Sequence, residues 1–189
     1  MSDAEQTTVT AIVLDFLPHG RQSARRARYE REPLVQALGV RDFRLYEILL
    51  EGEDSPSIGT EITLRPPTPP VDEFHEITYD DLSSGAGAEL EYAVAAIVDA
   101  DEQRFVSVYM EAQPITLRLH QLDLLPGIGD KLRDEILDAR RQGPFDDFDD
   151  LADRINGLHD PRSIIVDRII EELEDDDVKY RLFAAGGPF

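Results

Sequence analysis

Cysteine and tryptophan are absent from this chain of 189 residues, and lysine is nearly absent. Without cysteine there is no disulfide, no thiolate zinc site and no cysteine nucleophile. No apolar run approaches the roughly 20 residues that a membrane-spanning helix needs, and the acidic N-terminus lacks the layout of a signal peptide. We therefore expect a cytoplasmic protein that does not enter a membrane, with one large or two small domains.

The charge is strongly one-sided. The net charge of −21 comes from 40 acidic and 19 basic residues, and Lys131 and Lys179 are the only lysines. Such a chain either binds basic partners or carries its acids as a solvated coat. Because the acids are spread along the whole chain, the composition favours the coat and resembles that of proteins from salt-loving archaea. In molar salt the Debye length is about 3 Å, so nucleic-acid binding there would rest on short-range N–H and arginine contacts.

The first part of the chain, residues 1–79, predicts a small antiparallel β-barrel of the OB-like kind. Short runs rich in β-branched and aromatic residues, separated by turn residues, indicate its strands. These strands are expected at residues 9–17, 43–50, 59–64 and 74–79. Residues 33–38 are expected to form a short helical turn. The fold class is therefore α+β, with this barrel followed by helices.

Residues 21–31 form the only basic cluster, with five arginines among eleven residues. One interpretation is a solvated loop whose arginines pair with nearby acids. The other is an arm that contacts phosphates or bases, with Tyr29 as a stacking platform. The candidate nucleic-acid contacts in this arm are Arg21, Arg25, Arg26 and Arg28.

Residues 80–112 read as a helical connector, with helices expected at 88–99 and 102–112. Residues 113–189 then predict an all-α tandem helix-hairpin-helix domain. Its later helices are expected to begin at Asp130, at Asp147 as a capping residue, and at Asp160-Pro161.

The stretch Leu122–Lys131 carries the central motif of this domain. Leucines at helical spacing precede a Pro-Gly-Ile-Gly turn, and a second apolar stripe follows it. Glycines at a helix start expose N–H groups that can bind a phosphate oxygen, and a lysine adds a point charge. The candidate phosphate-binding residues are Gly127, Ile128, Gly129, Asp130 and Lys131. The alternative is a plain αα-corner that binds nothing, and Arg133 stands where the general motif favours a small residue.

A degenerate copy of the motif follows at residues 155–160. It aligns with residues 125–130, but His159 replaces the second glycine. We expect this copy to keep a packing role and to have lost the phosphate clamp. Hairpins of this general class also often hold a monovalent cation such as potassium through main-chain carbonyls, which by motif position would belong to Asp123, Leu125 and Ile128.

Several segments together resemble an archaeal family, the domain of unknown function 655. They are Val13-Leu14-Asp15-Phe16-Leu17-Pro18-His19-Gly20 with the arginines after it, Arg31-Glu32-Pro33, Tyr79-Asp80-Asp81-Leu82, Gln113-Pro114-Ile115-Thr116 and His120-Gln121-Leu122. The resemblance implies an OB-like barrel ahead of tandem helix-hairpin-helix motifs and a nucleotide- or RNA-binding role. It also implies a link to translation or rRNA handling, since genes of the family often neighbour those of a ribosomal protein, an RNA polymerase subunit and an rRNA dimethyltransferase.

Three functions remain in competition. The first is a non-catalytic protein that binds nucleic acid, RNA rather than DNA, on or near the ribosome. The second is a protein-interaction adaptor on the ribosome or RNA polymerase without nucleic-acid contact. The third is an enzyme such as a nuclease, but the carboxylates at residues 146–150 come without the accompanying histidines of a catalytic site. We expect no catalytic residues and no other cofactor.

Overall fold

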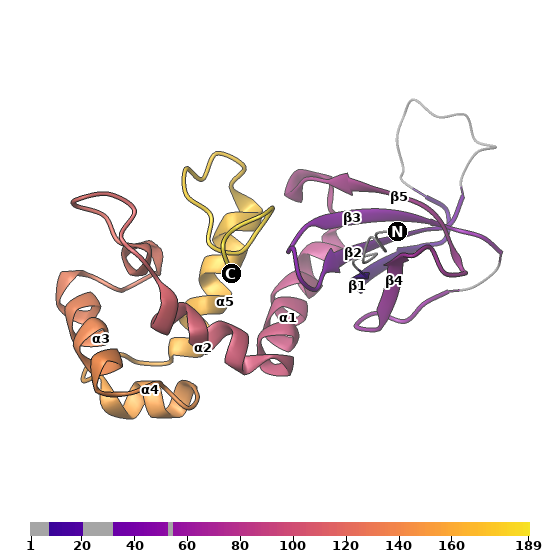
Figure 1. The fold of residues 1–189 in the computed structure, drawn as a ribbon. Helices are drawn as coiled ribbons and strands as arrows, with labels where there is room; N and C mark the ends of the chain where they lie inside the picture. The colour runs from indigo at the N-terminus through magenta and orange to yellow at the C-terminus, as the bar shows by residue number, and fades with distance from the viewer. Residues whose placement is uncertain (1–7, 21–31, 53–54) are drawn as a thin grey trace, which may run out of the picture. The chain divides into compact units, whose positions relative to one another are not determined.

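The computed structural model of the chain describes residues 8–20, 32–52 and 55–189 (Figure 1). Contacts divide the chain into two compact units, Met1–Ala93 and Val94–Phe189. The boundary falls inside helix α1 (Ser84–Ala100). The connector expected at residues 80–112 therefore contributes to both units.

The first unit is built on a five-stranded antiparallel sheet that curls into a half-barrel (Figure 1). The strands lie in the order β4-β1-β2-β3-β5. Their bounds are Val9–Leu17 for β1, Leu34–Gly39 for β2, Leu45–Leu50 for β3, Glu61–Arg65 for β4 and Val71–Ile77 for β5. Within the described residues no ladder joins the edge strands β4 and β5, so the barrel is open on one side. The α+β class and the antiparallel sheet are confirmed.

Strand β2 corrects the expectation of a helical turn at residues 33–38. All six of its residues are buried, and β1 and β3 pair with its two edges. A strand covered on both faces shows no apolar–polar alternation, so its sequence resembles that of a short buried helix. The last strand is displaced as well, because β5 ends at Ile77 and Tyr79–Asp81 forms a 3-10 helix, η1.

Polar contacts fix the start of α1 to the strands. The Ser83 N–H donates to Gln36 Oε1 at 2.7 Å, and the Ser83 hydroxyl donates to the Asp15 carboxylate at 2.5 Å. The same hydroxyl oxygen accepts the N–H of Ala86 at 3.0 Å, which caps the first turn of the helix. These bonds explain how the polar side chain of Gln36 is tolerated inside the first unit.

The second unit is helical and has its own apolar core. After the end of α1 come α2 (Glu102–Glu111), η2 (Gln121–Leu124), α3 (Asp130–Gln142), α4 (Phe148–Arg154) and α5 (Pro161–Glu174). Buried side chains from these elements form the core: Phe105, Tyr109, Leu122, Ile136, Leu151, Ile165 and Ile169. No helix in the described parts of the chain has the length and apolar character needed to cross a membrane.

The first arm of the expected hairpin is not an α-helix, which is a second correction. Residues 113–120 form a loop closed by a β-bridge between Pro114 and His120, and only the four residues of η2 turn in a 3-10 helix. Leucines three residues apart suit a 3-10 helix as well as an α-helix. The bridge joins residues six apart, which a helical pattern does not anticipate.

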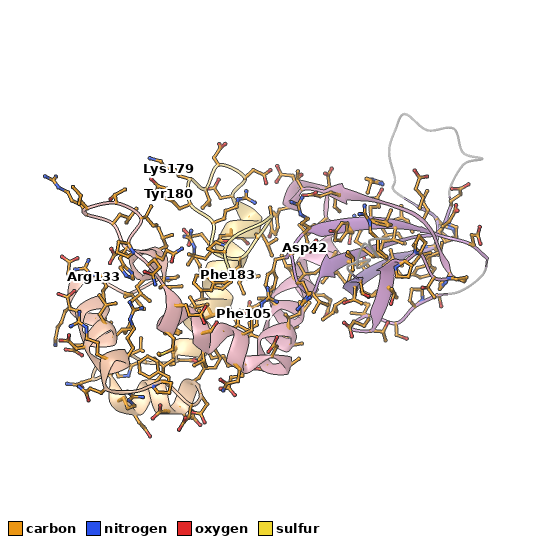
Figure 2. All side chains as sticks on the ribbon, in the orientation of Figure 1. Asp42, Phe105, Arg133, Lys179, Tyr180 and Phe183 are labelled. Atoms are coloured by element: carbon orange, nitrogen blue, oxygen red, sulfur yellow. The ribbon has the colours of Figure 1, made fainter. Side chains whose placement is uncertain are left out.

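A buried carboxylate anchors the C-terminal segment. Glu172 of α5 accepts the N–H groups of Leu182 at 2.7 Å and of Phe183 and Ala184 at 3.0 Å each. Arg168, one turn earlier on α5, donates to the same carboxylate at 2.9 Å. The Phe183 ring then lies beside Phe105 of α2, with centroids 6.1 Å apart (Figure 2).

Candidate nucleic-acid interface

The turn at residues 125–129 has the backbone that its sequence predicts. Gly127 has φ +76°, a conformation in which a side chain would be strained. The Ile128 N–H donates to the Leu125 carbonyl at 3.1 Å and closes the turn. Leu125 and Ile128 are buried, so they anchor the turn to the core while Gly127 and Gly129 face solvent.

The two glycines leave the backbone accessible. A Cβ added at Gly127 or at Gly129 would have no heavy atom within 4 Å. Gly129 is also the N-cap of α3, and it provides no side chain to cap the first turn. The N–H groups that begin α3 have no acceptor inside the helix, so they are available to an anion from outside.

Lys131 lies on this first turn with its side chain 80% exposed, and its Nζ is 3.7 Å from Glu135 Oε1. An exposed pair of this kind holds the ammonium group weakly. A phosphate that approached the turn could therefore recruit Lys131 at little cost.

Arg133, which departs from the general motif, binds the carboxylates around the turn. Its Nη1 lies 3.1 Å from Asp123 and 2.9 Å from Asp130, and its Nη2 lies 3.0 Å from Asp134. The hydrogen bond with Asp134, followed by the negative charge of Asp123, raises the pKa of Arg133. Arg133 thereby ties η2 to α3 and offsets part of the negative charge beside the exposed N–H groups.

A histidine cap that the sequence reasoning missed positions η2. His120 Nδ1 accepts the main-chain N–H of Leu122 at 3.1 Å, and the Asp123 carboxylate accepts the main-chain N–H of His120 at 2.7 Å. Burial, together with the positive charge of Arg140, lowers the pKa of His120, which keeps the ring neutral and able to accept. The spacing of three between His120 and Asp123 is that of a capping box, and this signal could have located the cap.

Arg154 binds at the opposite, C-terminal end of α3. Its Nη2 donates to the carbonyls of Ala139 at 2.8 Å and Gly143 at 3.1 Å, while Nη1 bonds Asp150 at 3.1 Å. A cation is thus bound at the C-terminal end of α3, where it also complements the helix dipole. The open end of α3 is the N-terminal one.

The second turn, residues 155–159, has the same backbone in different surroundings. Gly157 has φ +90°, and the Leu158 N–H donates to the Ile155 carbonyl at 3.2 Å. A Cβ at Gly157 would lie 3.8 Å from Cδ2 of Leu132, so this turn packs near α3. His159 occupies the place of the second glycine and is exposed.

The helix after the second turn has its N-terminus occupied. Asp160 is the N-cap of α5, and its carboxylate accepts the Ser163 N–H at 3.0 Å. Hydrogen bonds from the hydroxyl and N–H of Ser163 lower the pKa of Asp160, so the cap stays negatively charged. Pro161 follows at the first helical position and has no N–H to offer.

The predicted arginine arm and the predicted cation site are the two remaining candidate sites. The arm residues Arg21, Arg25, Arg26 and Arg28 lie outside the described residues. Of the three carbonyls predicted to hold a cation, that of Leu125 accepts the Ile128 N–H, and its second lone pair remains free for a ligand. No group of three or more metal-binding side chains occurs in the described ranges, and the predicted cation site would consist of main-chain carbonyls alone.

Comparison with known proteins gives consistent matches over most of the chain. The model of the family described as "Protein of unknown function (DUF655)" matches residues 7–185. The uncharacterized protein MJ0038 of Methanocaldococcus jannaschii is 36% identical over 176 residues, which cover 92% of this chain and 78% of that protein. The crystal structure of Af1531 from Archaeoglobus fulgidus, a DUF655 family-model structure, is similar with a TM-score of 0.83 and 36% identity. That match covers 93% of this chain and 99% of the other.

Proposed function

The chain belongs to the DUF655 family, and from that premise we propose that it is a non-catalytic RNA-binding protein. In this proposal the turn at residues 125–129 and the start of α3 form the hairpin that binds the phosphate backbone. The second turn belongs to the same tandem helix-hairpin-helix arrangement but does not bind phosphate. The half-barrel is an OB-like module of the same protein, and the RNA is one handled in translation or rRNA maturation. Archaeal relatives and a composition suited to high salt fit this setting.

The observation that carries the proposal is the contrast between the two ends of α3. At the C-terminal end Arg154 bonds the carbonyls of Ala139 and of the C-cap Gly143, whereas the N-terminal amides lie beside two exposed glycines with open space around them. Directed N–H groups at a helix start are suited to a phosphate oxygen. A clamp made of backbone groups contacts phosphate and carries no sequence preference of its own.

The charge of the chain sets the conditions under which this clamp works. Acids surround the turn, and at low salt they would repel a polyanion. In molar salt the screening length shrinks to about 3 Å, so the contacts within hydrogen-bond reach decide binding. A potassium ion on the carbonyls of Asp123, Leu125 and Ile128 would add positive charge beneath the phosphate. The arginines at residues 21–28 complete the proposal as a second contact to the strand.

A second candidate function rests on a separate observation. An acidic hollow of about 410 Å³ in the helical unit is lined by Asp99, Glu102, Asp149, Asp160 and Arg162, with Phe148 and Pro161 among its apolar walls. A hollow of this charge suits a lysine or arginine of a basic protein. It favours the adaptor role, in which the protein contacts a ribosomal protein or RNA polymerase and not the RNA.

One pair of variants tests the RNA clamp. Gly129→Leu places a bulky side chain over the N–H groups without straining the backbone, since Gly129 has φ −97° and open space around it. We expect affinity for a labelled RNA in molar potassium chloride to fall by about tenfold or more, the effect of losing about 1.4 kcal/mol of binding free energy.

Gly87→Leu is the matched control, because Gly87 also has open space around its Cα and lies in α1. It should leave the affinity unchanged. Equal affinities for Gly129→Leu and the wild type would rule out the clamp. Cross-linking in native salt then separates the two candidates, since an adaptor contacts protein, and not RNA, at residues 127–131.

A further inference from the structure

The loop of residues 113–120, here called the finger, stands away from the helices of its unit (Figure 1). Its tip carries Leu117, which is fully exposed at 106% of its reference area, followed by Arg118, which is exposed as well. Single exposed apolar residues are common on protein surfaces. A leucine with no part of its side chain covered, at the tip of a hydrogen-bonded loop, is a stronger indication of a binding surface.

Hydrogen bonds give the finger a defined shape. The N–H groups of Ile115 and Thr116 both donate to the Leu119 carbonyl, at 2.8 and 3.0 Å. The Arg118 N–H donates to Thr116 Oγ1 at 3.2 Å. A loop closed in this way holds its tip outward, so the exposure of Leu117 follows from the fold and not from the absence of structure.

The base of the finger is joined to the proposed clamp. Two hydrogen bonds join Gln113 and Gln121. The Gln121 main-chain N–H donates to the Gln113 carbonyl at 2.9 Å, and the Gln113 main-chain N–H donates to Gln121 Oε1 at 2.6 Å. His120 then caps η2, and Asp123 of η2 bonds Arg133 of α3. An unbroken series of contacts therefore leads from the finger to the helix whose N-terminus we assign to the phosphate.

The charge at the tip fits a nucleic-acid strand. Among the described residues no acid forms an ion pair with Arg118, although the chain has 40 acidic residues. By contrast, Arg133, Arg154, Arg162 and Arg168 each pair with at least one carboxylate. The finger thus presents an apolar side chain and an available guanidinium next to each other.

We propose that the finger is a wedge: Leu117 inserts between neighbouring bases of the RNA held at the clamp, and Arg118 binds an adjacent phosphate. This inference rests on the proposed function and names its partner more closely, as a base-paired RNA that is locally unstacked. Leucine side chains serve as such wedges in proteins that kink a duplex. The wedge adds a further RNA contact, and this one lies in the same helical unit as the clamp.

The test uses the full chain and an RNA hairpin that carries a fluorescent adenine analogue, which brightens when it unstacks. Wild-type protein should brighten the probe on binding. Leu117→Ala should lose most of the brightening and bind about tenfold more weakly, as expected when one leucine is no longer buried. Leu117→Phe should keep the brightening. Ile58→Ala removes another exposed apolar side chain, 51% exposed on the first unit, and should behave as the wild type.

The outcomes separate the wedge from the clamp. If wild-type binding depends on Gly129 but Leu117→Ala brightens the probe and binds as the wild type does, the wedge is wrong and the clamp stands. If a photo-cross-linker at position 117 captures protein in place of RNA in the native lysate, the wedge is wrong and the clamp is judged by the Gly129 variant alone. If no RNA binds, both proposals fail.

Discussion

The turns at residues 125–129 and 155–159 share one backbone and differ in what surrounds it. Each has a glycine with positive φ, at +76° and +90°, and a closing hydrogen bond of 3.1 or 3.2 Å. The apolar residues that flank each glycine are buried in both copies. The backbone of the turn therefore serves packing in both places and does not by itself indicate a ligand.

The difference begins one residue after the turn. Helix α3 starts directly at Asp130 with an uncapped N-terminus, whereas α5 starts one residue later with Asp160 as its cap and Pro161 in its first turn. Asp160 and Asp130 align in sequence, yet only Asp160 closes the end of its helix. A shift of one residue in the position where the helix starts is enough to change an exposed N-terminus into a closed one.

The largest expected effect concerns α5, the helix that follows the second turn. Glu172→Ala would leave Arg168 without its buried carboxylate partner, together with three N–H groups that lose their acceptor. We expect the free energy of unfolding to fall by about 3 kcal/mol or more, as for breaking a buried ion pair. Urea unfolding measures it.

The neighbouring Glu171→Ala is the control. Glu171 also pairs with Arg168, at 2.9 Å, but its side chain is 54% exposed. Its removal should lower the free energy of unfolding by no more than about 1 kcal/mol. Similar losses for the two variants would contradict the structural role assigned to Glu172.

A smaller effect compares the two glycines directly. Gly127→Ala and Gly157→Ala each put a methyl group on a residue with positive φ, so each should lose about 1 to 2 kcal/mol of stability. RNA affinity should fall severalfold for Gly127→Ala alone, because only the first turn is proposed to approach a phosphate. A loss of affinity in both variants, measured by fluorescence anisotropy, would remove the functional distinction between the turns.

The smallest effect concerns the cap that belongs only to the first turn. Burial lowers the pKa of His120 in the folded protein, so the unfolded chain binds more protons around pH 6.5, the ordinary pKa of histidine. The contribution of neutral His120 to stability is therefore complete above that pH and is lost as the pH falls. We expect unfolding at a lower urea concentration at about pH 5.5 than at about pH 7.5.

His120→Asn supplies a cap that does not titrate, so the pH dependence should become shallower in this variant. If the variant keeps the full slope of the wild type, other groups cause it and the role given to the His120 cap is wrong.

Local signals predicted much of this fold. The strand at residues 9–17 is found as expected, and Asp147 and the Asp160-Pro161 pair mark the starts of α4 and α5. Each of these signals acts over a few residues, through capping hydrogen bonds or through the fixed φ of proline. The glycine turns were predicted for the same reason.

The errors share a non-local cause. Strand β2 is specified by its neighbours β1 and β3, and the finger is closed by a bridge between Pro114 and His120. Arg133, Arg154 and Glu172 likewise each bond at least one residue outside their own helix. Spacing along the sequence identifies residues on one face of a helix, but it does not identify what that face meets.

The scarcity of lysine makes Lys131 chemically addressable. An amine-reactive reagent can modify only Lys131, Lys179 and the terminal amine, and both lysines are exposed. Lys131 lies on the open turn, while Lys179 lies on the C-terminal segment with its Nζ 5.1 Å from the centroid of the Tyr180 ring. The ratio of acylation at the two lysines, read by mass spectrometry, would therefore report occupancy of the first turn without any engineered label, with Lys179 as the internal reference.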